Sequence, residues 1–145
     1  MPEPLPSGAG GARYLLDTNA VSALVRDPGG PVDRRARVEG AAALCTSVVV
    51  AAELRYGLAK RGASPALARR VDGVLRRLRV LPLEPPADTA YGALRARLEA
   101  EGRPIGANDL LVAAHALALG LTVVTDNERE FRRVPGLAVE NWLRS

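Results

Sequence analysis

Residues 104–120 read PIGANDLLVAAHALALG, a turn followed by a run that is apolar on nearly every side. Pro104 and Gly106 favour the turn, and Asn108 can cap a helix by accepting a backbone N–H. A helix that is apolar all round belongs in the core of a protein. We therefore expect Asp109 in the first turn of a buried helix, where the positive end of the helix dipole keeps its carboxylate charged. An acid in such a place calls for a counter-ion.

The size and composition of the chain are typical of one globular domain. It has 145 residues, 48% of them hydrophobic, and a mean hydropathy of +0.01. The net charge of +4 and the pI near 10.0 favour a polyanionic partner. Aromatic residues amount to 3%, so contact with nucleic acid would rest on backbone phosphates and not on base stacking.

The N-terminal residues, the single cysteine and the longest apolar run indicate the compartment of the protein. Residues 1–11 are rich in Pro, Gly and Ala and lack an apolar signal region, so they are expected to form a disordered leader before one domain at 12–145. Cys45 lies in an apolar context and fits a core residue in a reducing cytoplasm. The apolar run at 110–119 is too short for a membrane span, which takes roughly 20 residues. We expect a cytoplasmic protein with no membrane partner.

Strand and helix patterns alternate along the chain. Short runs of β-prone residues predict strands at 13–16, 43–46, 80–83, 122–125 and 138–140. Helices are predicted at 20–26 (capped by Thr18 or Asn19), 32–39, 47–57, 65–78, 88–101 (capped by Asp88), 110–119 and 128–133. The valines at 48–50 also suit a strand, but we adopt a helix with Ser47 as its cap. The alternation predicts an α/β fold with a central parallel sheet of four or five short strands layered between helices.

Four acids stand where apolar elements end or begin. Asp17 follows the first strand, Glu53 projects from the apolar face of the 47–57 helix, and Asp126 follows the 122–125 strand, while Asp109 opens the central helix. The carboxyl ends of parallel strands share one edge of a sheet. Carboxylates gathered there repel one another unless a cation lies between them, and oxygen ligands suit Mg²⁺ or Mn²⁺. Such a metal leaves positions open for water and a substrate phosphate, which points to phosphodiester hydrolysis.

Other chemistries have less support in the sequence. It contains no phosphate-cradling loop ending in Gly-Lys-Ser/Thr, no nucleophile elbow around a serine, and no His or Cys pair suited to zinc. His115 is six residues from Asp109 and points away from its face of the helix, so it is expected to be a packed or surface residue. A phospho-acceptor domain would need a lysine at a later strand end, and Lys60, the only lysine, is not there.

The order and spacing of several motifs resemble the PIN-domain nucleases, and within them the VapC-type toxins of bacterial toxin–antitoxin pairs, including the FitB-like subgroup. The motifs are YLLDTN at 14–19, TS at 46–47, AELRYG at 52–57, PIG and ND within 104–109, AAHA at 113–116, VTDN at 124–127, Phe131, and VPGL at 134–137. The resemblance implies a PIN-like fold, Mg²⁺- or Mn²⁺-dependent endoribonuclease activity, a homodimer, and inhibition by a cognate VapB-type antitoxin.

The resemblance also implies roles for single residues. Three acids match the family's principal metal-site positions, namely Asp17, Glu53 and Asp109. The fourth position has three candidates: Asn127 stands where many relatives carry an acid, Asp126 fills the variable position beside it, and Glu130 follows on the next helix. We take Asp126 as the fourth catalytic and metal-binding residue. Supporting hydroxyl and amide groups are expected at Thr18, Asn19, Ser47, Thr125 and Asn127.

The expected reaction is hydrolysis of an RNA phosphodiester by an activated water, with no covalent enzyme intermediate. The contrasting hypothesis is a non-catalytic PIN-like module that acts through its dimer and partner surfaces, and the presence of all three principal acids argues against it. Residues 55–79 are strongly basic, with Asp72 as the only acid. That segment, which resembles an arm more than a core element, could contact phosphates, dock an acidic antitoxin segment, or be a solvated helix face.

Overall fold

The computed structural model describes residues 10–144 of the chain. Its strands are β1 (Tyr14–Leu16), β2 (Leu44–Ser47), β3 (Val80–Leu81), β4 (Thr122–Val124) and β5 (Val139–Glu140). Its α-helices are α1 (Thr18–Arg26), α2 (Pro31–Glu39), α3 (Val48–Arg61), α4 (Pro65–Leu78), α5 (Ala87–Ala100), α6 (Ala107–Leu119) and α7 (Glu128–Phe131), with a short 3₁₀ helix at Ala41–Ala43.

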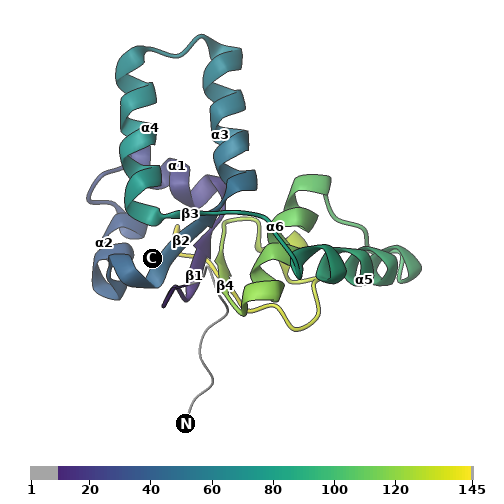
Figure 1. Ribbon diagram of the computed structural model, residues 1–145. Helices are drawn as coiled ribbons and strands as arrows, with labels where there is room; N and C mark the ends of the chain where they lie inside the picture. The colour runs from purple at the N-terminus through teal and green to yellow at the C-terminus, as the bar shows by residue number, and fades with distance from the viewer. Residues whose placement is uncertain (1–9, 145) are drawn as a thin grey trace.

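All strand pairs are parallel, in the order β3-β2-β1-β4-β5. The central strand is β1, where Leu15 lies opposite Cys45 of β2 and Val123 of β4. Figure 1 shows α1 and α2 on one side of the sheet and α5 and α6 on the other, while α3 and α4 project as a helical hairpin. The predicted α/β fold, with a parallel sheet layered between helices, is confirmed.

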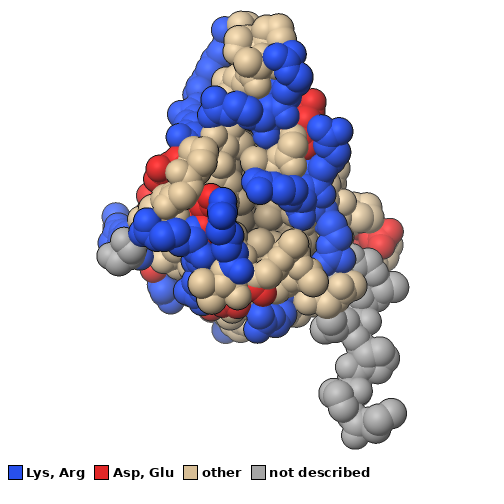
Figure 2. Space-filling model, turned by 90° about the vertical axis from the view of Figure 1, so that its left-hand side faces the viewer, with Lys and Arg blue, Asp and Glu red and all other residues tan. Residues whose placement is uncertain are grey.

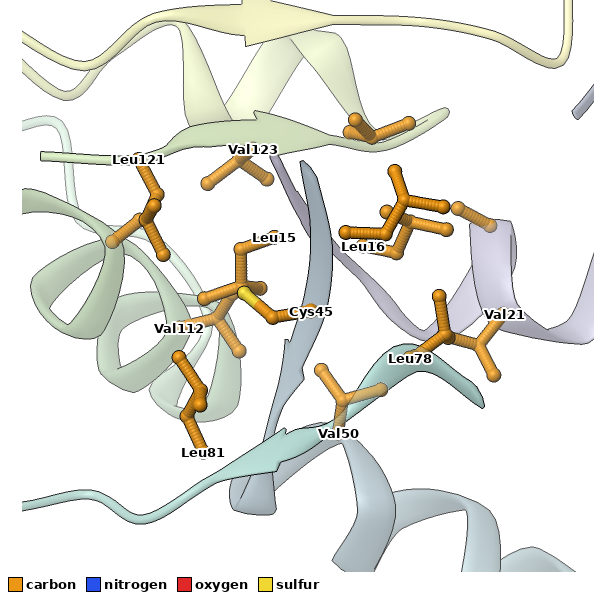
Figure 3. Packing of buried hydrophobic residues seen from close by; sticks show 14 of the residues in the cluster. Leu15, Leu16, Val21, Cys45, Val50, Leu78, Leu81, Val112, Leu121 and Val123 are labelled. Carbon is orange, nitrogen blue, oxygen red and sulfur yellow. The ribbon is translucent and has the colours of Figure 1, made fainter. Parts of the chain in front are cut away.

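The core fills both faces of the central strand. Leu15 and Leu16 are both fully buried and point to opposite faces because side chains alternate along a strand. In Figure 3, Leu15 lies with Val112 of α6, and Leu16 lies on the side of Val21 of α1 and Leu78 of α4. Strands buried on both faces need continuous apolar runs, which is what these short segments supply. The sheet is therefore fixed from both sides, and its carboxyl edge is held in place.

The α3–α4 hairpin is only partly an arm. Ser47 caps α3 as predicted, with its Oγ accepting from Val49 N at 3.0 Å. Ser64 caps α4 in the same way through Leu67 N. The second half of α4 buries an apolar stripe spaced three and four residues apart, made of Val71, Val74, Leu75 and Leu78. The expectation of an arm therefore holds for the projecting end of the hairpin and is wrong for the base of α4.

Three predicted helix caps are wrong. Thr18 is the first residue of α1, and Asp17 occupies the cap position without a side-chain bond to the helix. Asp88 lies inside the first turn of α5, which begins after Pro86. Asn108 lies inside the first turn of α6, whose cap position is Gly106. Hydrogen bonds to distant residues take up the side chains of Asp17 and Asn108 in place of local caps.

The expected leader at 1–11 falls mostly outside the described residues. At its end, Gly10 O accepts from the guanidinium of Arg79 at 3.4 Å. Cys45 is fully buried, as expected of a core residue, and burial raises the pKa of its thiol to about 12. No helix within residues 10–144 combines the length and the apolar character that a membrane span requires.

Candidate metal centre

Asp17 lies at the end of β1, where it is held by a hydroxyl. Its side chain is 4% exposed, and Oδ2 accepts from the Thr125 hydroxyl at 2.9 Å. The Thr125 oxygen accepts from Asn19 Nδ2 (3.2 Å) and from Asn127 N (3.0 Å), so its proton is left for Asp17. Burial raises the pKa of Asp17, and hydrogen bonds to the carboxylate oppose that rise. Thr125 thus orients the Asp17 carboxylate, and Asn19 donates to the Thr125 hydroxyl.

Glu53 reaches the same edge from α3. Its Oε1 accepts from the Thr18 hydroxyl at 3.3 Å, and the Asn108 side chain also donates to the carboxylate. Burial and then the charge of Asp17 raise the pKa of Glu53, while the two hydrogen bonds lower it. The two carboxylates therefore lie close enough to repel each other.

Asp109 and Glu130 are joined by one amide. Asp109 lies in the first turn of α6, and Glu130 lies on α7. Asn127 Nδ2 donates to Asp109 Oδ2 at 2.8 Å and to Glu130 Oε2 at 3.0 Å. A side-chain NH₂ group has two hydrogens, so this amide uses both of them on the two acids. Asn127 therefore binds both carboxylates at once.

The carboxylates form one electrostatic group, which we call the acid cluster and which consists of Asp17, Glu53, Asp109 and Glu130. The pKa of Asp109 is raised to about 8, first by burial, then by a hydrogen bond with Glu130, and then by the neighbouring negative charges. The same hydrogen bond lowers the pKa of Glu130. The proton is thus held on Asp109 at neutral pH, which removes one negative charge from the acid cluster.

Asp126 follows Thr125 directly, but its side chain is turned away from the acid cluster. Its Oδ1 accepts from Asn141 Nδ2 at 3.0 Å and lies 3.9 Å from Arg144 Nε, and the side chain is 50% exposed. The neighbour at the acid cluster is Asn127, with Glu130 one helical turn further on. The structure therefore places Asn127 and Glu130 beside Asp109 and leaves Asp126 at the surface.

Ser47 and His115 form a buried pair at the start of α3. His115 is 2% exposed, and its Nδ1 lies 2.8 Å from Ser47 Oγ. Oγ also accepts from Val49 N, so the Ser47 hydroxyl links the ring of His115 to the first turn of α3. Burial lowers the pKa of His115, which favours the neutral ring. His115 is thus a packed residue, as expected. The hydrogen bonds of Ser47 support the start of α3, the helix that carries Glu53.

Positive charge borders the acid cluster and extends over a wider face. A groove between α1, α3 and α4 is lined by Glu53 together with Arg26 and Arg61. Lys and Arg side chains also gather on the side of the molecule that carries α2 and α4 (Figure 2). Asp72 is the only acid of the segment 55–79, and Arg55 pairs with it. Two other arginines of that segment, Arg70 and Arg79, donate to backbone carbonyl groups, so only part of its positive charge is left to act on a partner or on solvent.

The donor set suits a hard divalent cation. Carboxylate oxygens are the ligands that Mg²⁺ and Mn²⁺ prefer, and the neighbouring negative charges that help to raise the pKa of Asp109 also favour a cation. Across residues 10–144, no three His, Cys, Asp or Glu side chains already stand around one point at ligand geometry. Hydroxyl and amide donors take up oxygens of the acids, so side-chain rotation must bring the carboxylates together before they share an ion.

The metal-free protein should lose stability as the pH rises from about 5 to about 8. The pKa of Asp109 lies near 3.8 ordinarily and near 8 in the folded protein. Between these values the folded state keeps a proton that the unfolded chain has released, so the free energy of unfolding falls with pH. Asp109→Asn removes the titrating group and should flatten this slope in denaturant titrations with EDTA present. Glu99→Gln, which changes an exposed acid paired with Arg95, is the control; equal slopes in wild type and Asp109→Asn would contradict the proton assignment.

The chain is similar to known proteins along most of its length. A family model of the PIN domain matches residues 14–137. Ribonuclease VapC2 of Rickettsia felis is 38% identical over 130 residues, which cover 89% of this chain and 97% of the relative. The tRNA(fMet)-specific endonuclease VapC of Salmonella typhimurium is 35% identical over 130 residues, which cover 90% of this chain and 98% of that protein.

Solved structures show the same likeness. The crystal structure of VapBC2 from Rickettsia felis, bound to a DNA fragment from their promoter, matches with a TM-score of 0.83 and 35% identity, covering 89% of this chain and 98% of that one. PIN-domain nucleases in general depend on a divalent metal, which agrees with the donor set of the acid cluster. With the family model matched along most of the chain and relatives this similar over nearly their whole length, the chain belongs to the PIN-domain family, in its VapC ribonuclease branch.

Proposed function

We propose that this chain is the toxin of a toxin–antitoxin pair, an endoribonuclease that depends on Mg²⁺ or Mn²⁺ and is neutralised by a VapB-type antitoxin. The relatives are ribonucleases by name, and the matching crystal structures are VapBC complexes. The observation that carries the proposal is the acid cluster, in which four acids lie close together and burial and neighbouring negative charges raise the pKa of Glu53 and Asp109. Repulsion between carboxylates lowers the stability of the folded protein unless a bound cation offsets it.

The chain's own residues perform most of the proposed mechanism. Asp17, Glu53, Asp109 and Glu130 would hold the metal, and the proton on Asp109 must leave when the cation binds. Thr125 keeps the Asp17 carboxylate oriented, and Thr18 does the same for Glu53. The bound cation would supply the charge that holds a phosphodiester and makes a water more acidic.

The groove beside Glu53 offers a path for the RNA strand. Arg26 and Arg61 line it together with Thr18, so phosphates that enter the groove meet cations within reach of the acid cluster. One relative is named for tRNA(fMet), and initiator tRNA is therefore the first substrate to test. A homodimer stays a prediction. A non-catalytic binding module remains the contrasting function, and cleavage of RNA by the purified protein separates the two.

Asp17→Asn and Asp109→Asn should each lower metal-dependent RNA cleavage by roughly a hundredfold or more, because each change removes a charged ligand and keeps the shape. Asp17→Asn should also raise the stability of the metal-free protein, since it relieves repulsion in the acid cluster, and Asp109→Asn should do so above a pH of about 8, where Asp109 of the wild type is charged. Cleavage assays with Mg²⁺ or EDTA and thermal unfolding measure the two effects. Asp88→Asn, at an exposed position on α5, is the matched control. Full cleavage by Asp109→Asn would remove this residue from the mechanism.

Glu130→Gln should reduce cleavage much more than Asp126→Asn. Glu130 shares the Asn127 amide with Asp109, whereas Asp126 is half exposed and faces Asn141. Both changes remove one negative charge and add an amide, so the pair is matched. Initial rates over a series of Mn²⁺ concentrations measure the difference. A larger loss in Asp126→Asn would return the fourth position to Asp126.

Arg76→Ala combined with Arg77→Ala should weaken RNA binding similarly for different sequences. Both arginines are exposed on α4, a helix on the side of the molecule where Figure 2 shows many Lys and Arg side chains. Each phosphate contact on single-stranded RNA contributes about 0.7 to the slope of log K against log salt, so the slope should fall by about 0.7 to 1.4. Metal affinity should not change.

The matched control removes two arginines of α5, Arg95 and Arg97, which pair with glutamates four residues on. If the α4 variant keeps the salt slope but escapes the antitoxin, the segment 55–79 belongs to the antitoxin interface. If both properties are unchanged, α4 presents a solvated face and the prediction fails.

A further inference from the structure

The last described residues of the chain close over the turn that carries Asn127. Strand β5 lies beside β4, and Thr125 N donates to Glu140 O at 3.0 Å. The next residue, Asn141, donates from Nδ2 to Asp126 Oδ1 at 3.0 Å and to Glu128 Oε2 at 3.1 Å. Asn141 therefore binds the residue before Asn127 and the residue after it.

The contacts of Asn141 require an amide. Its Oδ1 accepts from Leu143 N at 2.9 Å, while its NH₂ group faces two carboxylates. Only an amide has an acceptor and two donors in this arrangement. An aspartate there would place a third carboxylate against Asp126 and Glu128, and a leucine of similar shape would make none of the bonds.

A buried aromatic residue anchors Asn141. The neighbouring Trp142 is 4% exposed, and its ring packs edge-on against Tyr14 at 5.0 Å and under the Arg35 guanidinium at 4.9 Å. The Trp142 Nε1 donates to Glu140 Oε1 at 2.9 Å. The segment thus has a fixed base on β1 and α2, from which the Asn141 amide reaches the turn.

The other side of the turn is also held. Asp126 N donates to Asn19 Oδ1 at 2.9 Å, and Asn127 N donates to Thr125 Oγ1 at 3.0 Å. These bonds fix the backbone, and Asn141 fixes the two flanking side chains. What remains free to point inward is the side chain of Asn127, whose amide lies between Asp109 and Glu130.

We propose that Asn141 is a positioning residue for the metal centre: it holds Asp126 and Glu128 so that Asn127 stays bound to Asp109 and Glu130 and keeps both carboxylates where they can turn onto a divalent cation. This inference rests on the proposed function. In this inference, Asp126 is the hydrogen-bond acceptor through which the C-terminal segment holds the turn. Loss of an outer hydrogen-bonding partner of metal ligands lowers metal affinity by about 10- to 100-fold.

The test uses Mn²⁺ alone, without RNA, on the full chain. Mn²⁺ binding is followed by electron paramagnetic resonance, and thermal unfolding is followed in EDTA. Asn141→Leu should weaken Mn²⁺ binding about tenfold, and Asn141→Asp should weaken it further. Thermal unfolding in EDTA should barely move for Asn141→Leu, because water can reach Asp126 (50% exposed) and Glu128 (27% exposed). A merely structural role would lower the melting temperature and leave Mn²⁺ affinity intact.

A double-mutant cycle tests the route of the effect. If Asn141 acts through Asn127, then Asn141→Leu should cost little further Mn²⁺ affinity in an Asn127→Ala background. Arg132→Ala is the control, since Arg132 pairs with Glu128 at 3.0 Å from within the same helical segment. It should leave Mn²⁺ affinity unchanged.

Two results would overturn the inference and leave the proposed function standing, provided that the wild type binds Mn²⁺ and cleaves RNA. In the first, Asn141→Leu binds Mn²⁺ within twofold of the wild type. In the second, Asn141→Leu lowers Mn²⁺ affinity as much in the Asn127→Ala background as in the wild type. If wild type neither binds Mn²⁺ nor cleaves RNA, the proposed function and this inference fail together.

Discussion

Carboxylates from β1, α3, α6 and α7 repel one another at one edge of the sheet, and neutral donors hold them there. Thr125, Thr18 and Asn127 each donate to an acid without bringing a positive charge. An arginine at any of these positions would satisfy the acid cluster permanently and remove its attraction for a mobile cation. The choice of hydroxyl and amide donors therefore keeps the acids close, oriented and still in need of positive charge.

The rest of the fold supplies the rigidity that this repulsion requires. Leu15 and Leu16 are fully buried on opposite faces of the central strand, so the end of β1, and with it Asp17, cannot move away. The apolar helix α6 fixes Asp109 in the same manner. Metal sites need ligands on rigid elements, and this one is built on strand ends and first turns of helices.

Asp17 and Asp126 have similar sequence contexts but different positions and hydrogen-bond partners in the structure. Asp17 is buried among donors, while Asp126, at the end of a neighbouring strand, lies at the surface and binds the C-terminal segment. Local surroundings are similar, since both follow an apolar strand. What separates them is the partner that the tertiary structure supplies: Thr125 for Asp17, and Asn141 for Asp126.

The sequence by itself determined the alternation of strands and helices, the Ser47 cap, and the three acids that the structure gathers, because each depends on a short local pattern. It did not determine the fourth position or the cap residues of α1, α5 and α6. Asp126 and Asn127 are adjacent, and only the turn after β4 sends one side chain outward and the other to Asp109. Asn108 likewise reads as a cap until Glu53, brought near by folding, takes its amide. Hydrogen-bond partners that are distant in the sequence determine where these side chains point. Such partners compete with local hydrogen bonds, and they come within reach only when the chain is folded.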